Sequence, residues 1–419
     1  MRDNWCKITL DKVCEKTANI KWSEQNGKNY RYIDLSAVSR ETLTITESSV
    51  VNTDNAPSRA KKIIIKGDVI FATTRPTLKR VTIINKEFDN QICSTGYAVL
   101  RPVKSKIYSQ FIYYFTLSEY FMNRMETLQR GASYPAVSDK DVKLSSLWLP
   151  PLPEQKAIVK ILDEAFAKID QANANIEKNI ENAKELFQSK LNEIFSQRNA
   201  LSSSKGGEGD ALSLPKGWEE KKLGEVVDIS SGGTPSKREP SFWGGNIPWV
   251  SPKDMKSLII VNSRDKITSK ALEEGRAKLH GIDTVLIVVR SGILSRTIPL
   301  AITKKEITIN QDLKALRVNS KLIPQYLLNF LRANEPLLLL LVTRGATVHR
   351  LETPTLKQLR IIFPNKKLQT DINKLVKLLE SHMTTLLKLH EKKIEDLKEL
   401  KKSLLQKAFA GELTKMSKP

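Results

Sequence analysis

Two stretches of the chain carry apolar side chains at alternating steps of three and four residues, which is the spacing of a coiled-coil seam. The first runs from Pro150 to Phe195 and contains no Gly or Pro after Pro153. The second runs from Lys367 to Ala410 and stops at Gly411, a usual helix terminator. The apolar positions are Ile158, Leu162, Ala165, Ile169, Ala172, Ile176, Ile180, Ala183, Phe187, Leu191 and Ile194 in the first stretch, and Ile372, Leu375, Leu379, Met383, Leu386, Ile394, Leu397 and Leu404 in the second. The pattern predicts two long helices, the first on the order of 65 Å long, and so thin a helix cannot bury its apolar stripe alone.

The charges of the two stretches favour pairing them with each other. Residues 151–197 carry 6 basic and 8 acidic side chains, whereas residues 366–419 carry 13 basic and 7 acidic ones. Opposite net charges favour two helices as partners in a coiled coil. The alternative is two unrelated surface helices, and we prefer an antiparallel pair.

The residues before and within the first helix have counterparts 213 to 216 positions later in the chain, before and within the second helix. Matching positions are Trp5, Leu10 and Val13 with Trp218, Leu223 and Val226; the strand-like runs 67–75 and 98–102 with 283–290 and 314–318; the run 130–133 with 344–347; and Gln155 and Ile158 with Gln369 and Ile372. Identity is low, but order and spacing persist. The sequence therefore predicts a duplicated unit, a globular domain plus a long helix, with a pseudo-two-fold relation between the copies.

The expected fold class is α+β, with two basic globular domains joined by two long antiparallel coiled-coil helices. Within the first domain we expect strands in residues 61–74, 91–101 and 142–149, and an aromatic-rich helix over 110–128. The run SSSKGGEGD cannot pack and predicts a hinge. The predicted boundaries are 1–149 for the first globular domain, 150–197 for the central helix, 198–213 for the flexible linker, 214–365 for the second globular domain, 366–411 for the C-terminal helix and 412–419 for the tail.

Composition identifies the class of partner. The formal net charge is +22 and the pI is about 9.7. Residues 1–150 carry 23 basic and 15 acidic side chains and residues 214–365 carry 24 and 14, so both globular parts are basic. Because no apolar run is long enough to span a bilayer and the first residues lack a signal-peptide pattern, we expect a cytoplasmic protein whose polyanion is a nucleic acid, with no membrane partner. Cys6, Cys14 and Cys93 form no CxxC pair, so we expect neither a disulfide framework nor a zinc site.

Two loops in each globular part offer side chains that suit DNA. Arg and Lys suit guanine, and Asn and Gln suit adenine, while phosphate contacts set position. The candidate DNA-binding residues are Arg75, Lys79, Arg80, Arg130, Ser133 and Tyr134 in the first part, and Arg290, Ser291, Arg296, Arg344, Thr347, His349 and Arg350 in the second. For any single residue, a surface charge that keeps the protein soluble is the competing explanation. Phe242, Trp243 and Trp249 could stack on bases, but packing in a core is the commoner fate.

Three segments resemble the specificity subunits of type I restriction-modification enzymes. They are LPPLPEQKAIVKILDEAFAKID at 149–170, LPKGWEEKKLGEVVDISSGGTPSKREPSFWGGNIPWVSPKDM at 214–255, and KKSLLQKAFAGEL at 401–413. The resemblance covers essentially the whole chain, although the first domain lacks the GGTPS…WGG signature of the second. It implies two target recognition domains that each read half of a bipartite site on double-stranded DNA, and no catalytic residues. It also implies that two modification subunits dock on the chain and use S-adenosylmethionine to methylate adenine at N6. By the same resemblance, two translocating endonuclease subunits can then join the assembly.

The motifs of an enzyme are missing from the sequence. There is no glycine-rich cofactor loop with an Asn/Asp-Pro-Pro-aromatic motif, and SGGTPSK at 231–237 does not fit the GxxxxGK[ST] phosphate loop. His382 and His390 have no third ligand nearby in the sequence, so we expect no metal site and no cofactor on this chain. Two alternatives to a DNA specificity subunit remain open at this point. One is a self-sufficient enzyme acting on nucleic acid, and the other is an RNA-binding or architectural protein without enzymatic partners.

Overall fold

The structure is a computed structural model that describes residues 4–25, 27–195, 217–275 and 277–414. The predicted linker at 198–213 and most of the predicted tail lie outside the described residues. The chain divides into two compact units. Unit 1 comprises Met1–Glu177 with His390–Pro419, and unit 2 comprises Lys178–Leu389. Each unit is described by itself below.

Unit 1 contains two four-stranded sheets, with strand orders β2-β9-β6-β7 and β4-β3-β8-β5, and a separate β1-β10 pair. The only parallel pairing among these described strands is β3 with β8. β6 is buried at every position because it lies inside its sheet and is covered on both faces. The strands are β1 Cys6–Thr9, β2 Cys14–Glu15, β3 Tyr30–Ile33, β4 Ser49–Val51, β5 Ala60–Ile64, β6 Val69–Ala72, β7 Val81–Ile83, β8 Gln91–Ser94, β9 Tyr97–Pro102 and β10 Ser146–Leu149.

Local capping divides two elements that the sequence pattern predicts as continuous. The expected helix over 110–128 is two helices, α1 Ser109–Leu117 and α2 Glu119–Leu128, because Ser118 caps α2 by accepting a hydrogen bond from the Phe121 amide at 3.3 Å. The expected strand over 142–149 is wrong in its first part. A capping box between Ser138 and Asp141 starts α3 (Asp139–Lys143), so the strand begins only at β10.

Unit 2 repeats this topology and adds an edge strand, β14, and a β18–β22 pair. Its sheets have strand orders β12-β21-β17-β19-β14 and β15-β13-β20-β16, and β11 pairs with β23 as β1 pairs with β10. The parallel pairing of β13 with β20 corresponds to that of β3 with β8. The strands are β11 Trp218–Lys222, β12 Val227–Ser231, β13 Trp243–Val250, β14 Ile259–Ile260, β15 Asp265–Ile267, β16 Leu279–His280, β17 Val285–Val288, β18 Arg290–Ser291, β19 Leu300–Thr303, β20 Ile307–Ile309, β21 Leu313–Val318, β22 His349–Arg350 and β23 Arg360–Pro364.

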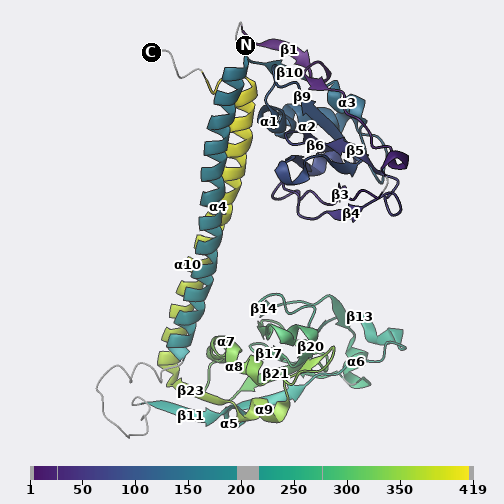
Figure 1. The fold of residues 1–419 in the computed structure, drawn as a ribbon. Coiled ribbons are helices and arrows are strands. Elements are labelled where there is room, and N and C mark those ends of the chain that lie inside the picture. Colours follow the sequence, from purple (N-terminus) through teal and green to yellow (C-terminus); the bar gives the residue numbers. More distant parts are fainter. Residues whose placement is uncertain (1–3, 26, 196–216, 276, 415–419) are drawn as a thin grey trace. The chain divides into compact units, whose positions relative to one another are not determined.

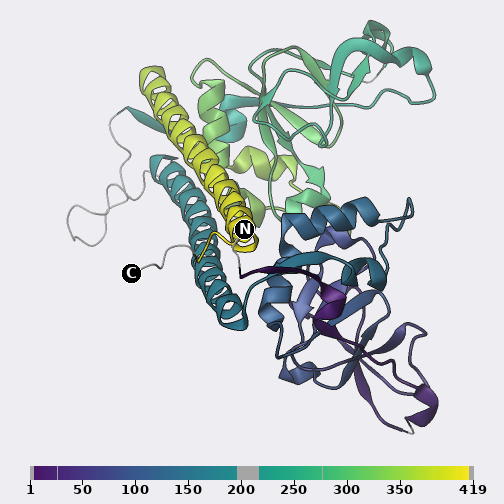
Figure 2. The ribbon, with the colours of Figure 1, turned by 90° about the horizontal axis from the view of Figure 1, so that it is seen from above.

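Short helices complete unit 2. They are α5 Leu223–Val226, α6 Ser269–Glu273, α7 Pro324–Ala333, α8 Glu335–Leu340 and α9 Thr353–Gln358. Single 3₁₀ turns occur in both units at Leu10–Lys12, Trp22–Glu24, Pro76–Leu78, Lys86–Phe88, Pro240–Phe242 and Gly292–Ser295. α7 packs on the sheet that contains β17, and both contribute buried side chains to the unit 2 core (Figures 1 and 2).

Both long helices are present, as α4 Leu152–Phe195 and α10 Lys366–Phe409. Gly411 follows α10 with φ +75°, the left-handed conformation typical of a helix C-terminus. In unit 1 the start of α4 contacts the end of α10: Thr414 donates a hydrogen bond to Glu154 at 2.8 Å, and Lys401 forms an ion pair with Asp170. At these contacts the two helices run in opposite directions (Figure 1).

The last turn of each long helix closes the core of a globular part. In unit 1, Phe409 of α10 packs on Phe111 and Phe115 of α1, with ring centroids 5.1 and 5.6 Å away. In unit 2, Phe195 of α4 packs on Tyr326 and Phe330 of α7 at 5.2 and 6.3 Å. The core of unit 1 therefore includes side chains from the two ends of the sequence.

A buried glutamine anchors the first turn of each long helix. Gln155 donates from Nε2 to the carbonyls of Pro150 (2.8 Å) and Lys106 (2.9 Å) and accepts from the Tyr108 amide (2.9 Å). Its counterpart in unit 2 makes the same three contacts. Gln369 donates to Pro364 (2.8 Å) and Lys321 (2.9 Å) and accepts from the Ile323 amide (2.8 Å). Both glutamines have no exposed surface, so each fixes the direction in which its helix leaves the globular part.

Replacing Gln155 by Ala is expected to loosen the start of α4. The change leaves three buried backbone groups without partners, at a cost of about 3 kcal/mol, which corresponds to amide exchange in the first turns that is faster by roughly a hundredfold. Hydrogen–deuterium exchange of residues 152–159 measures this. Lys156→Ala, at the exposed neighbouring position, is the control. Equal exchange in the two variants would contradict the anchoring role.

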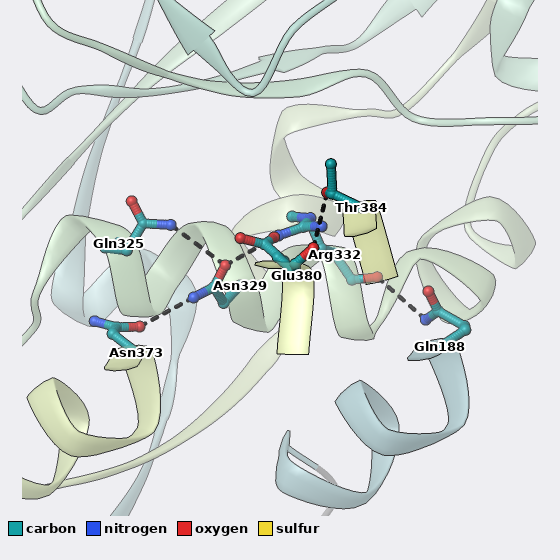
Figure 3. Close-up of polar contacts among 7 residues, drawn as sticks. All are labelled: Gln188, Gln325, Asn329, Arg332, Asn373, Glu380 and Thr384. Carbon is teal, nitrogen blue, oxygen red and sulfur yellow. Dashed lines mark hydrogen bonds and ion pairs between the residues drawn. The ribbon is translucent and has the colours of Figure 1, made fainter. Parts of the chain in front are cut away.

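In unit 2 a polar network connects α7 to both long helices (Figure 3). Asn329, which is 1% exposed, donates to Asn373 of α10 at 3.0 Å. Arg332 pairs with Glu380 of α10, and Gln188 of α4 donates to the Arg332 carbonyl at 3.5 Å. In the matching region of unit 1, Tyr114 packs on Phe166 at 5.5 Å. Tyr114 also donates a hydrogen bond to Asp163 of α4, so both units combine aromatic and polar contacts with the helices, and the polar network is larger in unit 2.

Candidate nucleic-acid interface

In unit 1 the structure brings together the two loops predicted to bind DNA. The chain leaves the buried strand β6 and pairs with the loop after α2 through a bridge between Thr74 and Ala136. The Arg75 amide donates to the Pro135 carbonyl at 2.6 Å, and the Val137 amide donates to the Thr73 carbonyl at 2.9 Å. The two loops form one surface, although more than fifty residues separate them in the sequence.

Arg75 occupies the centre of this surface. Its backbone is in the left-handed region, with φ 48°, a strained conformation for a residue with a Cβ. The guanidinium lies 4.8 Å from the ring centroid of Tyr134, and Nη2 donates to the Ser133 carbonyl at 3.2 Å. Tyr134 is 71% exposed, so the stacked pair faces solvent. Strain and an exposed aromatic side chain are both more frequent at binding sites than elsewhere.

The other unit 1 candidates differ in accessibility. Lys79 and Arg130 are exposed, and the Arg130 backbone pairs with Ala136 in the same surface. Arg80 is half-buried, and its Nη1 donates to the Leu35 carbonyl at 2.8 Å. We infer that Arg80 holds the loop in place, whereas Lys79 and Arg130 are free to meet a phosphate.

Unit 2 joins its two predicted loops in the same way. β18 pairs with β22, so Arg290 lies opposite Arg350 and Ser291 lies opposite His349. A further bridge joins Thr343 to Arg350. Ser291 caps the following turn, where its hydroxyl accepts from the Ile293 amide at 3.4 Å. Arg296, Arg344 and Thr347 are exposed, and His349 is half-buried.

The sequence analysis missed the residues that surround Arg290. A cleft of about 440 Å³ lies beside it, lined by Lys237, Lys253, Asn310 and Asp312 as well as Ser291 and Val348. Arg290 Nε forms an ion pair with Asp312 Oδ1 at 2.9 Å. Asp312 directly precedes β21, and β21 pairs with β17, which Arg290 follows. This strand pairing brings the two residues together.

The tryptophans in and after the GGTPS…WGG signature of the second domain pack within the fold, as expected. Trp249 is 7% exposed, lies 5.2 Å from Trp243 in an edge-on contact, and donates to the Gly233 carbonyl at 2.9 Å. Gly232 has to be glycine because a Cβ there would lie 1.9 Å from the Ile309 carbonyl oxygen. The start of the GGTPS run therefore packs against the end of β20, and Trp249 lines the cleft.

Within the described ranges, no three or more His, Cys, Asp or Glu side chains gather in a way that could hold a metal ion. His382 is exposed and His390 is buried on the same helix. A bilayer-spanning helix is likewise not found in the part of the chain that the structure describes. The three cysteines are free, and burial raises the pKa of the Cys14 thiol to about 12, which keeps it protonated and unreactive.

Comparison with known proteins defines the class. The family model described as "Type I restriction modification DNA specificity domain" matches residues 2–182 and again 215–399. Two matches in one chain agree with the repeated topology of the two units. The chain belongs to the family of specificity subunits of type I restriction-modification systems. Members of this family are the non-catalytic DNA-recognition components of their enzymes.

Two curated relatives illustrate the extent of the similarity. The chain is 32% identical over 213 residues to the EcoR124I/EcoR124II specificity subunit of Escherichia coli, a match that covers 50% of this chain and 48% of the relative. It thus spans about half the length of that relative. It is 25% identical over 436 residues to the StySPI specificity subunit of Salmonella potsdam, which covers 98% of this chain and 90% of the relative.

Two solved structures resemble the fold over nearly the whole chain. The HsdS subunit from Thermoanaerobacter tengcongensis is 28% identical with a TM-score of 0.65, and 99% of this chain and 98% of that chain are covered. A chain from the work "Structural basis underlying complex assembly and conformational transition of the type I R-M system" is also 28% identical, with a TM-score of 0.80 and 99% of both chains covered.

Proposed function

We propose that this chain directs a type I modification enzyme to a split DNA site, with each globular domain reading one half of it. The first domain would comprise residues 1–149 and the second residues 214–365. The observation that carries the proposal is the equivalent pair of joined, exposed basic loops in the two units. Because the loops differ in sequence on a repeated frame, they suit two different half-sites.

The two long helices set the distance between the half-sites in this proposal. α4 and α10 pair as an antiparallel coiled coil, and their pseudo-two-fold relation gives two matched surfaces for two modification subunits that methylate adenine at N6. Support comes from the antiparallel contacts in unit 1, from the opposite charges of the helices, and from the identical glutamine anchors. Two restriction subunits can join the same assembly.

The test is to co-express the chain with its neighbouring modification subunit and to map N6-methyladenine across the host genome by long-read sequencing. We expect one split motif with a fixed gap, present only when both chains are expressed. Omitting this chain should abolish the motif, since the specificity resides in it. Methylation that persists without the chain would overturn the proposal.

The same experiment addresses the alternative of an RNA-binding or architectural protein, which no observation favours. Such a protein would give no methylated motif, and no modification subunit would co-purify with it. Methylation or cleavage by the purified chain alone would instead revive a self-sufficient enzyme.

A further inference from the structure

Asp312 forms an ion pair with Arg290 at the edge of the unit 2 cleft. Arg290 Nε pairs with Asp312 Oδ1 at 2.9 Å, and the Arg290 backbone amide donates to the Asp312 carbonyl at 3.2 Å. The arginine side chain remains 46% exposed, whereas the aspartate side chain is 21% exposed. The contact therefore pairs a solvent-facing cation with a largely covered anion by charge, without a hydrogen bond to Oδ1.

Asp312 is itself fixed by Asn310, which is only 6% exposed. The Asn310 side-chain amide donates to Asp312 Oδ2 at 3.0 Å, and the Asp312 backbone amide donates to Asn310 Oδ1 at 3.0 Å. The backbone amide of Asn310 donates to the Val250 carbonyl at 2.9 Å, beside the β13–β20 pair. A chain of contacts thus runs from the sheet through Asn310 and Asp312 to the guanidinium.

We propose that Arg290 is a guanine-reading residue of the second domain and that Asp312, supported by Asn310, is its positioning residue. This inference rests on the proposed function. An arginine whose Nε lies beside a carboxylate keeps its two terminal nitrogens for a ligand, and such a pair matches the O6 and N7 acceptors of guanine in the major groove. Among the described residues, neither terminal nitrogen of Arg290 makes a hydrogen bond to the protein.

The basic rim of the cleft agrees with a base-reading position. Lys237 and Lys253 line the same cleft as Arg290, and both are exposed. Lysines flanking a base contact are placed to meet phosphates, which fix register but carry no sequence information. Two carboxylates, Asp265 and Asp312, also line the cleft, and Asp312 is the one that pairs with Arg290.

In unit 1 the arginine at the equivalent position has different contacts. Arg75, the counterpart of Arg290, uses Nη2 to donate to the Ser133 carbonyl and stacks on Tyr134. One of its terminal nitrogens is therefore occupied. Because Arg290 keeps both terminal nitrogens available and its counterpart Arg75 does not, the preference for guanine is assigned to the half-site read by the second domain.

The experiment uses the chain assembled with its modification subunit and measures dissociation constants for duplexes with every base at each position of the second half-site. The variants are Arg290→Ala and Asp312→Asn. Glu220→Gln and Arg360→Ala are the matched controls, because this ion pair of 3.4 Å, with the arginine 69% and the glutamate 27% exposed, lies in the same unit and outside the cleft. Binding to non-specific duplex and thermal melting are measured for each variant, to verify folding.

We expect Arg290→Ala and Asp312→Asn each to reduce discrimination for guanine at one shared position by about tenfold or more. Asp312→Asn should leave non-specific binding equal or tighter, since it removes a negative charge near the phosphates. This combination separates positioning from a merely structural role, which would weaken binding to all duplexes.

Three results would overturn the inference. They are an unchanged base profile in Asp312→Asn, equal weakening on every duplex in Arg290→Ala, and a shared position that prefers a base other than guanine. In all three, a split motif in the wild-type complex leaves the proposed function standing. A wild-type complex without a split motif overturns both.

Discussion

Deleting residues 175–181 from α4 together with the repeat-matched residues 389–395 from α10 is expected to shorten the gap in the recognised site by about three base pairs. Seven residues correspond to about 10.5 Å of helix, and DNA rises about 3.4 Å per base pair. Both half-sites should stay the same, because the deleted turns lie outside the globular parts. Methylome mapping of a strain that carries the double deletion measures the gap directly.

Two controls sharpen this prediction. Deleting the seven residues from α4 alone should abolish modification, because the apolar positions of the two helices would no longer face each other. Replacing residues 1–149 by the corresponding part of a relative should change one half-site and leave the gap as it was. An unchanged gap in the double deletion would rule out the helices as the spacer.

Asp68→Asn is expected to be the most destabilising single substitution considered for unit 1. Asp68 is 1% exposed and forms a two-pronged pair with Arg101, at 2.9 Å to Nε and 2.8 Å to Nη2. Its Oδ2 also accepts from the Ile65 amide at 2.9 Å, and the hydrogen bonds that Asp68 accepts from Arg101 raise the pKa of the Arg101 guanidinium. Removing one partner of a buried pair leaves an uncompensated charge and costs about 3–5 kcal/mol.

Denaturant unfolding of the variant measures this loss. The matched control is Glu87→Gln, which breaks the pair of Glu87 with Arg31 on the surface, where the side chains are 57% and 44% exposed. That change should cost less than about 1 kcal/mol. A double variant that also replaces Arg101 by Met should regain part of the stability lost in Asp68→Asn. Equal losses in Asp68→Asn and Glu87→Gln would contradict the account.

The sequence pattern predicts local elements well where one periodicity dominates. The 3–4 spacing locates α4 and α10 to within a few residues, since nothing in the 44 residues of each helix competes with it. Prediction is poorer where a cap intervenes, as at Ser118, which divides an apolar helix into two. The expected strand over 91–101 is also two elements, β8 and β9, because these strands belong to different sheets.

The candidate loops were predictable because the repeat places different basic residues at equivalent positions. The structure joins those loops in each unit, and whether they bind DNA remains a prediction. Asp312 could not be linked to Arg290 from the sequence, because this contact depends on strand pairing across more than twenty residues. The network around Arg332 was also missed, since it needs the orientation of three helices.

The packing of the last turn of each long helix into a core also determines which unit can complete its core first during synthesis. Unit 2 is a continuous stretch of chain, whereas the core of unit 1 needs Leu405 and Ala408, which follow the first globular part by some 250 residues. At ribosomal speeds of about 5–20 residues per second, these side chains emerge roughly 13–50 seconds later. The part made first is therefore completed last, and the nascent chain keeps the apolar surface around Phe111 and Phe115 open until α10 arrives.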